Sequence, residues 1–412
     1  MLNHYALPPD LPGGTRHFDL GCELARLGYD VTIFASAFNH SLRKKTRLLD
    51  ASPWALEELD GVRFVWLPSM AYQGNDWRRL ANMLDYTWRA YWLGRRLTRL
   101  ARRVRPPDVI MGCAVHLFAV LAAYGLSRHY RARFLMEVRD LWPQTFLDMG
   151  VWREGQPQVR FFRCLEQFLY QRAEKIIVLS PLTGDYLAQY SPTWAEKTLY
   201  IPNGTRLIRF EQNGLGRRPE PGAVCAMYLG AMGITNGLEL ILDAMQVINQ
   251  QAGGQSAGID FCFVGDGPEK GRLQHLAKER GLHNVRFEKA VPRARVPDRL
   301  AEADILVLVQ KQVLYGSSNK LFDYMAAAKP IVFALLAEHN NLVEQARCGV
   351  SASPDDPVDL AQKILQLARM PVEERQAMGG RGRAFVRENH DYSVLARRLL
   401  EGLRHGEANG RG

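Results

Sequence analysis

The sequence has few cysteines and no uninterrupted apolar run long enough to cross a membrane. Its six cysteines are scattered, without a C-x-x-C pair or a His/Cys cluster, so the spacing typical of a structural zinc site or a disulfide framework is missing. A membrane-spanning helix needs about 18 consecutive apolar residues. The first residues, MLNHYALPPD, also lack a basic start followed by an apolar run. We therefore expect a cytoplasmic protein that is neither exported nor anchored by a helix.

Low-complexity tracts are missing too, since 47% of the residues are hydrophobic and 23% are charged, as in ordinary globular proteins. A chain of 412 residues exceeds the roughly 250 to 300 residues at which single cores stop growing, so two domains are expected. The net charge of +10 favours partners that carry phosphate, whether nucleotides, lipids or nucleic acid.

Short β-branched runs alternate with longer helical patterns, which predicts β-α-β units and a parallel sheet in each half. The expected strands are 31–35, 62–67, 109–113, 133–138 and 175–179, followed by 224–230, 260–265, 285–288, 305–309 and 330–334. A segment rich in Gly, Pro and Arg, from about Asn203 to Gly222, separates the two series. The fold class is thus α/β with two doubly wound, Rossmann-like domains.

The beginning of the chain is unusual, because a loop from His4 to Gly14 and a helix from Thr15 to Leu27 follow no convincing strand. Either the true start lies upstream or the opening strand is a stub.

The segment 76–105 carries nine arginines against two aspartates, interleaved with Trp and Tyr. At helical spacing one apolar stripe contains Trp77, Leu80, Leu84, Trp88 and Tyr91, and a second contains Leu93, Leu97, Leu100 and Val104. The register changes near Gly94, so a kink or two helices are expected. Two interpretations stay open. The segment is a core-packing helix with a solvated basic face, or it is a membrane-surface patch in which Arg meets anionic headgroups and Trp lies at the interface.

Three loops follow strands of the second half, where ligands bind in doubly wound sheets. In the first, Gly230 closes a strand and a helix starts near Asn236, which offers unpaired amides to a phosphate. In the second, Gly265 and Gly267 would let a base or ribose approach the backbone. The third precedes and opens a helix and contains Ser317, Ser318, Asn319, Lys320, Leu321 and, one turn later, Asp323. Lys320 would meet a phosphate and Asp323 a sugar diol. Ordinary turns and an exposed i,i+3 pair are the alternatives.

These loops resemble those of the retaining GT-B glycosyltransferases of family 4, and the similarity runs from about Asn3 to Leu403. In that family a G-R-x-x-x-x-K-G loop, a V-G-x-G-P loop and two glutamates eight residues apart occur in this order. The similar segments here are 230–237, 264–268 and 315–323. The resemblance implies a GT-B fold with an acceptor domain (1–203), a nucleotide-sugar donor domain (204–385) and a C-terminal helix (386–412) that crosses back to the first domain.

The sequence departs from the family at three positions. The loop arginine falls on Ala231, the lysine on Asn236 and the first glutamate on Tyr315. A branch resembling bacterial amino-fucose transferases has the same pattern, with a Ser-x-Lys segment and an R-D-L-W-P motif. Lys320 is then the replacement cation for the diphosphate, assisted by backbone amides.

In the first half, Gly13 and Gly14 resemble the glycine loop that lies against donor phosphate and acceptor, and Arg16 adds charge to it. For Arg16 a plain surface arginine is the alternative. Asp140 and Arg139 follow a strand at a position facing the cleft, as catalytic candidates, and His116 is a secondary one. A structural Arg139–Asp140 ion pair is the competing interpretation.

The expected function is transfer of a sugar, from a UDP-linked donor, to a glycan or polyprenyl-diphosphate-linked acceptor in cell-surface polysaccharide synthesis. Retention at the anomeric carbon is what the resemblance implies. No D-x-D pair occurs, so we expect no metal and no cofactor, and we expect peripheral attachment to the anionic inner face of the cytoplasmic membrane through segment 76–105. The alternatives are a non-hydrolysing nucleotide-sugar epimerase and an inactive basic adaptor for membrane or nucleic acid. No RNA-binding sheet motif supports a nucleic-acid partner.

Overall fold

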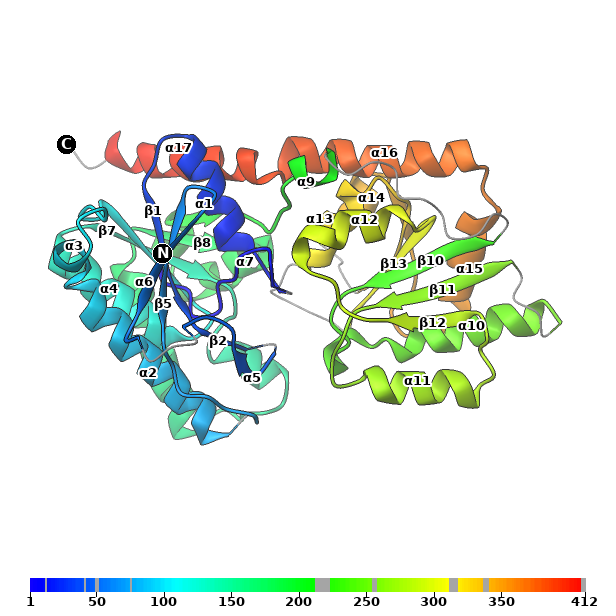
Figure 1. Ribbon diagram of the computed structural model, residues 1–412, viewed down its shortest axis with the longest axis horizontal. Helices are drawn as coiled ribbons and strands as arrows, with labels where there is room; N and C mark the ends of the chain where they lie inside the picture. The colour runs from blue at the N-terminus through cyan, green and yellow to red at the C-terminus, as the bar shows by residue number, and fades with distance from the viewer. Residues whose placement is uncertain are drawn as a thin grey trace.

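The computed structural model describes residues 1–11, 13–40, 42–48, 52–74, 76–211, 223–253, 258–310, 318–335 and 341–408. The chain forms two α/β halves side by side, joined by a linker that carries α9 (Ile208–Glu211) and by two long C-terminal helices (Figure 1).

The first half contains two main sheets, in the orders β1-β5-β4 and β6-β7-β8-β9, and a small two-stranded sheet, β2-β3. The β4–β5 and β2–β3 pairs are antiparallel, and the other pairs are parallel. Leu2 forms isolated parallel bridges to both Phe34 and Gly112, so one residue connects the two sheets. The strands are β1 (Val31–Ser36), β2 (Phe38–Asn39), β3 (Lys44–Lys45), β4 (Ala55–Leu59), β5 (Val62–Leu67), β6 (Val109–Cys113), β7 (Arg133–Val138), β8 (Lys175–Val178) and β9 (Thr198–Tyr200).

Helices cover the faces of these sheets, and α2, α4 and α6 pack in a row. The helices of this half are α1 (Arg16–Arg26), α2 (Trp77–Gly94), α3 (Leu97–Leu100), α4 (Leu117–Tyr130), α5 (Gln144–Asp148), α6 (Pro157–Arg172), α7 (Pro181–Tyr190) and α8 (Pro192–Glu196). The break between α2 and α3 after Gly94 confirms the predicted change of register.

The second half is built on one six-stranded parallel sheet in the order β12-β11-β10-β13-β14-β15. Its strands are β10 (Val224–Leu229), β11 (Ile259–Val264), β12 (Val285–Glu288), β13 (Ile305–Val309), β14 (Ile331–Ala334) and β15 (Gly349–Ser351). Its helices are α10 (Glu239–Gln251), α11 (Lys270–Glu279), α12 (Val296–Ala301), α13 (Asn319–Ala326), α14 (Leu342–Gln345), α15 (Pro357–Arg369) and α16 (Val372–Asn389), with short 3-10 turns at Ile234–Asn236 and Arg293–Arg295.

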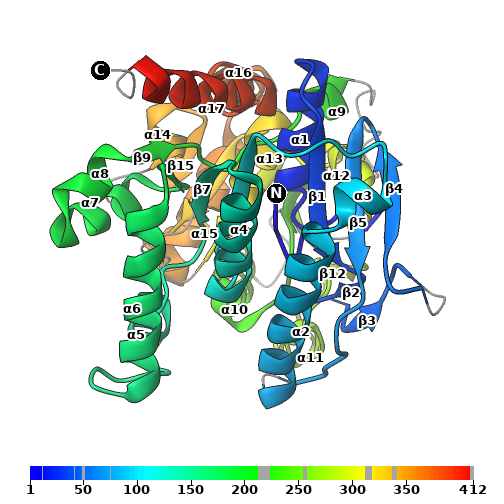
Figure 2. The same ribbon diagram turned by 90° about the vertical axis from the view of Figure 1, so that its left-hand side faces the viewer.

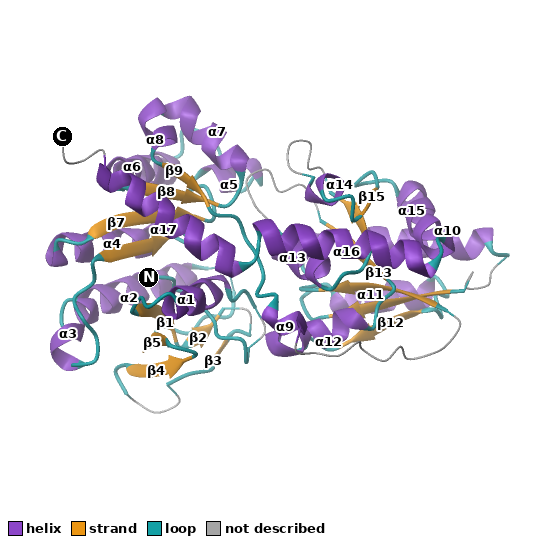
Figure 3. Ribbon diagram, turned by 90° about the horizontal axis from the view of Figure 1, so that it is seen from above, coloured by secondary structure: helices purple, strands orange, loops and turns teal. Residues whose placement is uncertain are grey.

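All ten predicted strands are confirmed, with each end within one residue, because uninterrupted apolar runs are typical of parallel strands that are buried on both faces. The short strands β2, β3, β4, β9 and β15 escaped prediction. After α16, helix α17 (Tyr392–Ala408) lies along the first half (Figure 3), where Tyr392, Leu395 and Leu399 join its apolar core. Among the described residues, no helix is long and apolar enough to span a bilayer.

Candidate functional site

Backbone hydrogen bonds join the loops that follow β10 and β11. The Gly230 amide donates to the Val264 carbonyl at 2.9 Å, and the Met232 amide to the Asp266 carbonyl at 2.8 Å. A Cβ on Gly265 would lie 1.9 Å from the Gly230 carbonyl oxygen, and one on Gly267 would lie 2.4 Å from that of Met232. Both oxygens belong to the backbone and cannot move aside as the end of a flexible side chain could, so a side chain at either position would clash. Contact between the loops therefore requires both glycines, whereas the approach of a nucleotide that the sequence suggested stays a prediction.

Lys320 from α13 reaches this pair of loops. Its Nζ donates to Oδ1 of Asn236 at 3.0 Å, while Nδ2 of Asn236 donates to the Ala231 carbonyl at 2.8 Å, which fixes the amide orientation. The lysine stem lies so close over Gly230 that an added Cβ would be 2.3 Å from Cε. Burial lowers the pKa of Lys320 to about 8. No described carboxylate pairs with this ammonium group, so a desolvated cation is available to an anion.

The first turn of α13 continues the site. Asn319 is exposed, Ser318 precedes it without a side-chain cap, and the Ser318 hydroxyl is buried without a partner among the described residues. Helix N-termini leave amides unpaired and attract anions. The side chain of Leu321 packs in the core of this half and its amide bonds the Ser318 carbonyl, so its assignment to the donor is corrected. Ser317 lies outside the described residues.

Asp323 was expected to meet a sugar diol, and the structure contradicts this. The carboxylate is 4% exposed and receives both terminal nitrogens of Arg293, one at 2.6 Å, together with the hydroxyl of Thr205 at 2.8 Å. The alternative of an exposed pair with Lys320 is wrong as well. Asp323 instead connects α13 to Thr205 of the linker. Its carboxylate needs partners, because an unpaired charge at this depth would be strongly destabilising.

The N-terminal glycine loop approaches the donor side. A Cβ on Gly14 would lie 3.7 Å from Nδ2 of Asn319, so this exposed loop and the start of α13 meet where the two halves face one another. Gly13 has φ of +143°, a conformation that side chains rarely adopt, and an added Cβ would lie 2.7 Å from Leu7. The structure thus brings Gly14, Asn319, Lys320 and the Gly230 loop together.

Arg16 does not face this site, which corrects its expected phosphate role. Only 3% of the residue is exposed, its Nε donates to Glu137 at 2.7 Å, and its terminal nitrogens donate to the carbonyls of Ile201 and Pro202. The interaction anchors α1 to β7 and to the start of the linker.

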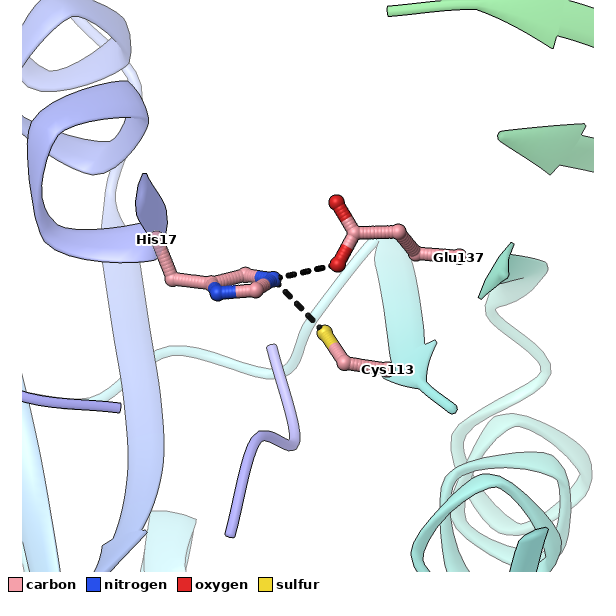
Figure 4. A group of neighbouring side chains, drawn as sticks. All are labelled: His17, Cys113 and Glu137. Carbon is pink, nitrogen blue, oxygen red and sulfur yellow. Dashed lines mark hydrogen bonds and ion pairs between the residues drawn. The ribbon is translucent and has the colours of Figure 1, made fainter. Parts of the chain in front are cut away.

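Glu137 also contacts His17 and lies near Cys113, all fully buried (Figure 4). His17 Nε2 lies 2.6 Å from the carboxylate and 2.9 Å from Cys113 Sγ. Ligands about 2.0 Å from a zinc ion stand farther apart than 2.6 Å in tetrahedral geometry, so these are hydrogen-bond distances. Asn3 Nδ2 lies 2.6 Å from His17 Nδ1 and its Oδ1 accepts from the Tyr5 amide, which favours a neutral imidazole protonated on Nε2.

This network keeps the carboxylate charged. Burial alone would raise the pKa of Glu137, but His17 and Arg16 hold it well below its ordinary value. Glu137 was not predicted from the sequence, although an acid near the end of the largely apolar strand RFLMEV was a signal for it. Arg293 and Thr205 left no comparable signal, because only the tertiary fold brings them to Asp323.

Asp140 lies just beyond β7. Its side chain is exposed, yet protein surrounds it closely enough that burial raises its pKa, against the opposing charges of Arg139 and Arg79. No ion pair within 4 Å joins Asp140 to Arg139, a pair that the structure describes fully, so the structural pair considered from sequence is not formed. Leu141 and Trp142 anchor the loop in the core. Asp140 thus retains the accessibility that a role in chemistry requires.

His116 has a structural position instead of a catalytic one. It is fully buried, caps α4 by accepting from the Ala119 amide at 3.2 Å, and contacts His4 Nδ1 through Nε2 at 3.0 Å. Burial lowers its pKa to about 3. We therefore withdraw it as a catalytic candidate.

Comparison with known proteins agrees with this geometry. Residues 13–204 match the family profile described as glycosyl transferase 4-like domain, and residues 224–370 match that of glycosyl transferases group 1. A probable glycosyltransferase, WbjE of Pseudomonas aeruginosa, is 24% identical over 333 residues, which are 77% of this chain and 79% of that protein. A 2-deoxystreptamine N-acetyl-D-glucosaminyltransferase of Streptomyces fradiae is 24% identical over 55% of each chain.

Solved structures of similar fold cover nearly the whole chain. Sucrose-phosphate synthase from Thermosynechococcus elongatus superposes with a TM-score of 0.73 at 17% identity, covering 99% of this chain and 98% of that one. HepE from Anabaena, solved in complex with UDP and glucose, has a TM-score of 0.65 at 16% identity and covers 98% of both chains. The expected GT-B fold is thereby confirmed. The chain is a glycosyltransferase, assembled from a 4-like domain and a group 1 domain.

Proposed function

We propose that this enzyme transfers a sugar from a UDP-linked donor to a glycan or polyprenyl-diphosphate-linked acceptor in cell-surface polysaccharide synthesis, with retention. The observation that carries the donor side is the Lys320 ammonium group, which lies between the Gly230 loop and the start of α13 and is bonded to Asn236 but to no described carboxylate. Two solved neighbours, HepE from Anabaena and TarM from S. aureus, hold UDP. A diphosphate is the ligand whose charge this cation and the adjoining amides would complement.

Departure of a nucleoside diphosphate needs fixed positive groups where negative charge develops. Lys320 and the first amides of α13 would supply them. In the Gly230 loop the amides of Gly230 and Met232 are already bonded, so Ala231 and Gly233 would contribute theirs. Asp140, from the other half, would act at the acceptor side, and the leaving phosphate would accept the proton of the attacking hydroxyl.

The membrane contact expected for segment 76–105 also belongs to this proposal. Along α2 four residues of the predicted stripe, Trp77, Leu80, Leu84 and Trp88, are exposed, whereas the fifth, Tyr91, packs against the apolar core. The opposite face, with Tyr86 and Ala90, is buried. The four exposed residues do not serve the core, which favours the membrane interpretation. An enzyme attached to the inner face of the cytoplasmic membrane through α2 would lie close to a lipid-linked acceptor.

A thermal-shift screen across nucleotide sugars, followed by NMR of the stabilising compound, tests the proposal. We expect UDP and a UDP-sugar to raise the melting temperature and the sugar to persist when no acceptor is present. The variant Lys320→Met should lose most of the shift, while Lys278→Met, at an exposed lysine of α11, should keep it. Conversion of the sugar without acceptor would instead identify an epimerase. Nucleic-acid binding with no response to any nucleotide sugar would identify an adaptor.

A further inference from the structure

The first half exposes a second apolar feature besides the stripe on α2, at the turn between α5 and α6. Met149 and Val151 are each 60% exposed there, and Phe161 near the start of α6 is 54% exposed. Seven large apolar side chains of the described chain are more than half exposed, and five of them lie on α2 or at this turn: Trp77, Trp88, Met149, Val151 and Phe161. Isolated exposed apolar residues are ordinary, but a concentration of this kind indicates an interaction surface.

The backbone holds this turn in place. Gly150 has φ of +69°, its amide donates to the Leu147 carbonyl at 2.9 Å, and the Val151 amide donates to the Phe146 carbonyl at 3.0 Å. This is the Schellman arrangement that ends a helix with glycine in the left-handed conformation. Met149 and Val151 are therefore presented to solvent by a defined turn.

Aromatic packing supports the turn from behind. Trp152 stacks on Phe146 with ring centroids 4.3 Å apart and on Phe162 at 5.6 Å, and Trp142 meets Phe146 edge to face at 4.7 Å. Neighbouring aromatic residues are thus drawn inward while Met149 and Val151 point away. Because Trp142 belongs to the loop that begins with Arg139 and Asp140, the turn and the candidate catalytic loop share one packed unit.

The two apolar features lie at the same end of the molecule. Figures 1 and 2, which differ by a rotation about the vertical axis, both show the N-terminal end of α2 and the α5–α6 turn as the lowest parts of the first half. The end of α2 and the α5–α6 turn project as separate points, because α4 lies between α2 and α6. A broad interface can contact both points at once.

Exposed arginines accompany each point. Arg78 follows Trp77, and Arg153 and Arg160 flank the base of the turn. None of the three forms an ion pair with a described residue. Apolar and tryptophan side chains with unpaired arginines beside them complement a bilayer with anionic headgroups. The apolar side chains insert while the cations remain at the surface.

We propose that the α5–α6 turn is a second membrane contact, which together with the α2 stripe seats the enzyme on an anionic bilayer at two points. This inference rests on the proposed function, in which a lipid-linked acceptor is used at the membrane. Two contacts fix orientation as well as attachment, and the second lies a few residues beyond Asp140.

Flotation with phosphatidylglycerol-rich and pure phosphatidylcholine vesicles tests the inference on the full chain. The turn variant is Met149→Asp with Val151→Asp, and the stripe variant is Trp77→Ser with Trp88→Ser. The matched control is Val358→Asp with Val372→Asp, at valines of the second half that are 45% and 48% exposed. We expect the wild type and the control to float with the anionic vesicles, less so at high salt, and each of the other variants to lose several-fold of the bound fraction.

Calorimetric titration with UDP separates this inference from the function on which it rests. All variants should bind UDP and elute from a sizing column as the wild type does. A turn variant that floats like the wild type would overturn the inference, and so would a wild-type dimer that only the turn variant dissociates. Failure of the wild-type protein to bind UDP would overturn the proposed function, whatever the vesicles show.

Discussion

The ammonium nitrogen of Lys320 lies 3.0 Å from Oδ1 of Asn236, the position at which the family's loop carries lysine. The two residues are 84 positions apart in sequence and come from different loops. In the proposed donor site, α13 supplies the charge that the family places on the Gly230 loop, and the asparagine holds it in position.

Gly230→Ala tests this arrangement. The added methyl group would lie 2.3 Å from Lys320 Cε, so the lysine must move and lose its bond to Asn236. A hydrogen bond to a charged group contributes about 1.5–3 kcal/mol, and we expect UDP to bind roughly tenfold or more weakly by calorimetry. Gly271→Ala, whose Cβ meets nothing within 4 Å, is the control. Unchanged affinity in Gly230→Ala would remove Lys320 from the donor site.

The lowered pKa of Lys320 predicts a pH dependence of donor binding. Its value of about 8 in the free protein results from burial, so the side chain is charged below pH 8 and neutral above it. Phosphate groups have their second pKa near 6 and do not titrate in this range. UDP affinity should fall as the pH rises through about 8, and Lys320→Met should bind weakly with no such decline.

The same shift has the opposite sign for stability. Because the folded state holds this proton less tightly than the unfolded chain, whose ordinary value is 10.5, the contribution of Lys320 to the free energy of unfolding rises from pH 8 to about 10.5. A profile for Lys320→Met that parallels the wild-type profile for both binding and stability would contradict the assignment.

Asp140→Asn should lower turnover while leaving UDP affinity within about twofold, because the carboxylate is exposed on the acceptor half. We expect a loss on the order of 10²-fold or more, as for removal of a group that stabilises charge in the transition state. Initial rates and calorimetry on the same preparation measure both quantities. Asp185→Asn, at an exposed aspartate of α7, controls for the loss of surface charge. Weaker UDP binding with normal turnover would reverse the assignment.

Asp323→Ala should destabilise the fold by about 3–5 kcal/mol, since it leaves the Arg293 cation buried without its partner. Urea unfolding monitored by circular dichroism measures the change. Asp298→Ala, which breaks a largely exposed pair with Arg295, should cost less than about 1 kcal/mol. Normal stability combined with weaker binding of the donor would instead restore the sugar-binding role that the sequence suggested for Asp323.

The sequence by itself determined the regular part of this protein. Alternation of apolar strands with helical patterns identified two α/β halves, because parallel strands buried on both faces need uninterrupted apolar runs. The order of the glycine loops identified the family, and the Ser-x-Lys segment pointed to Lys320 as the candidate cation for the diphosphate. These features are local, and local patterns can be recognised without knowing what lies across the fold.

The tertiary structure decided what each polar side chain contacts. The sequence suggested functional roles for Arg16, His116 and Asp323. In the structure their side chains are bonded to partners from distant segments: Arg16 to Glu137, His116 to His4, and Asp323 to Arg293. The stripe on α2 was recognised from its periodicity, but only packing showed that it faces solvent. Periodicity defines the two faces of a helix, whereas the partners available in three dimensions decide which face is buried and which polar groups remain free for a substrate.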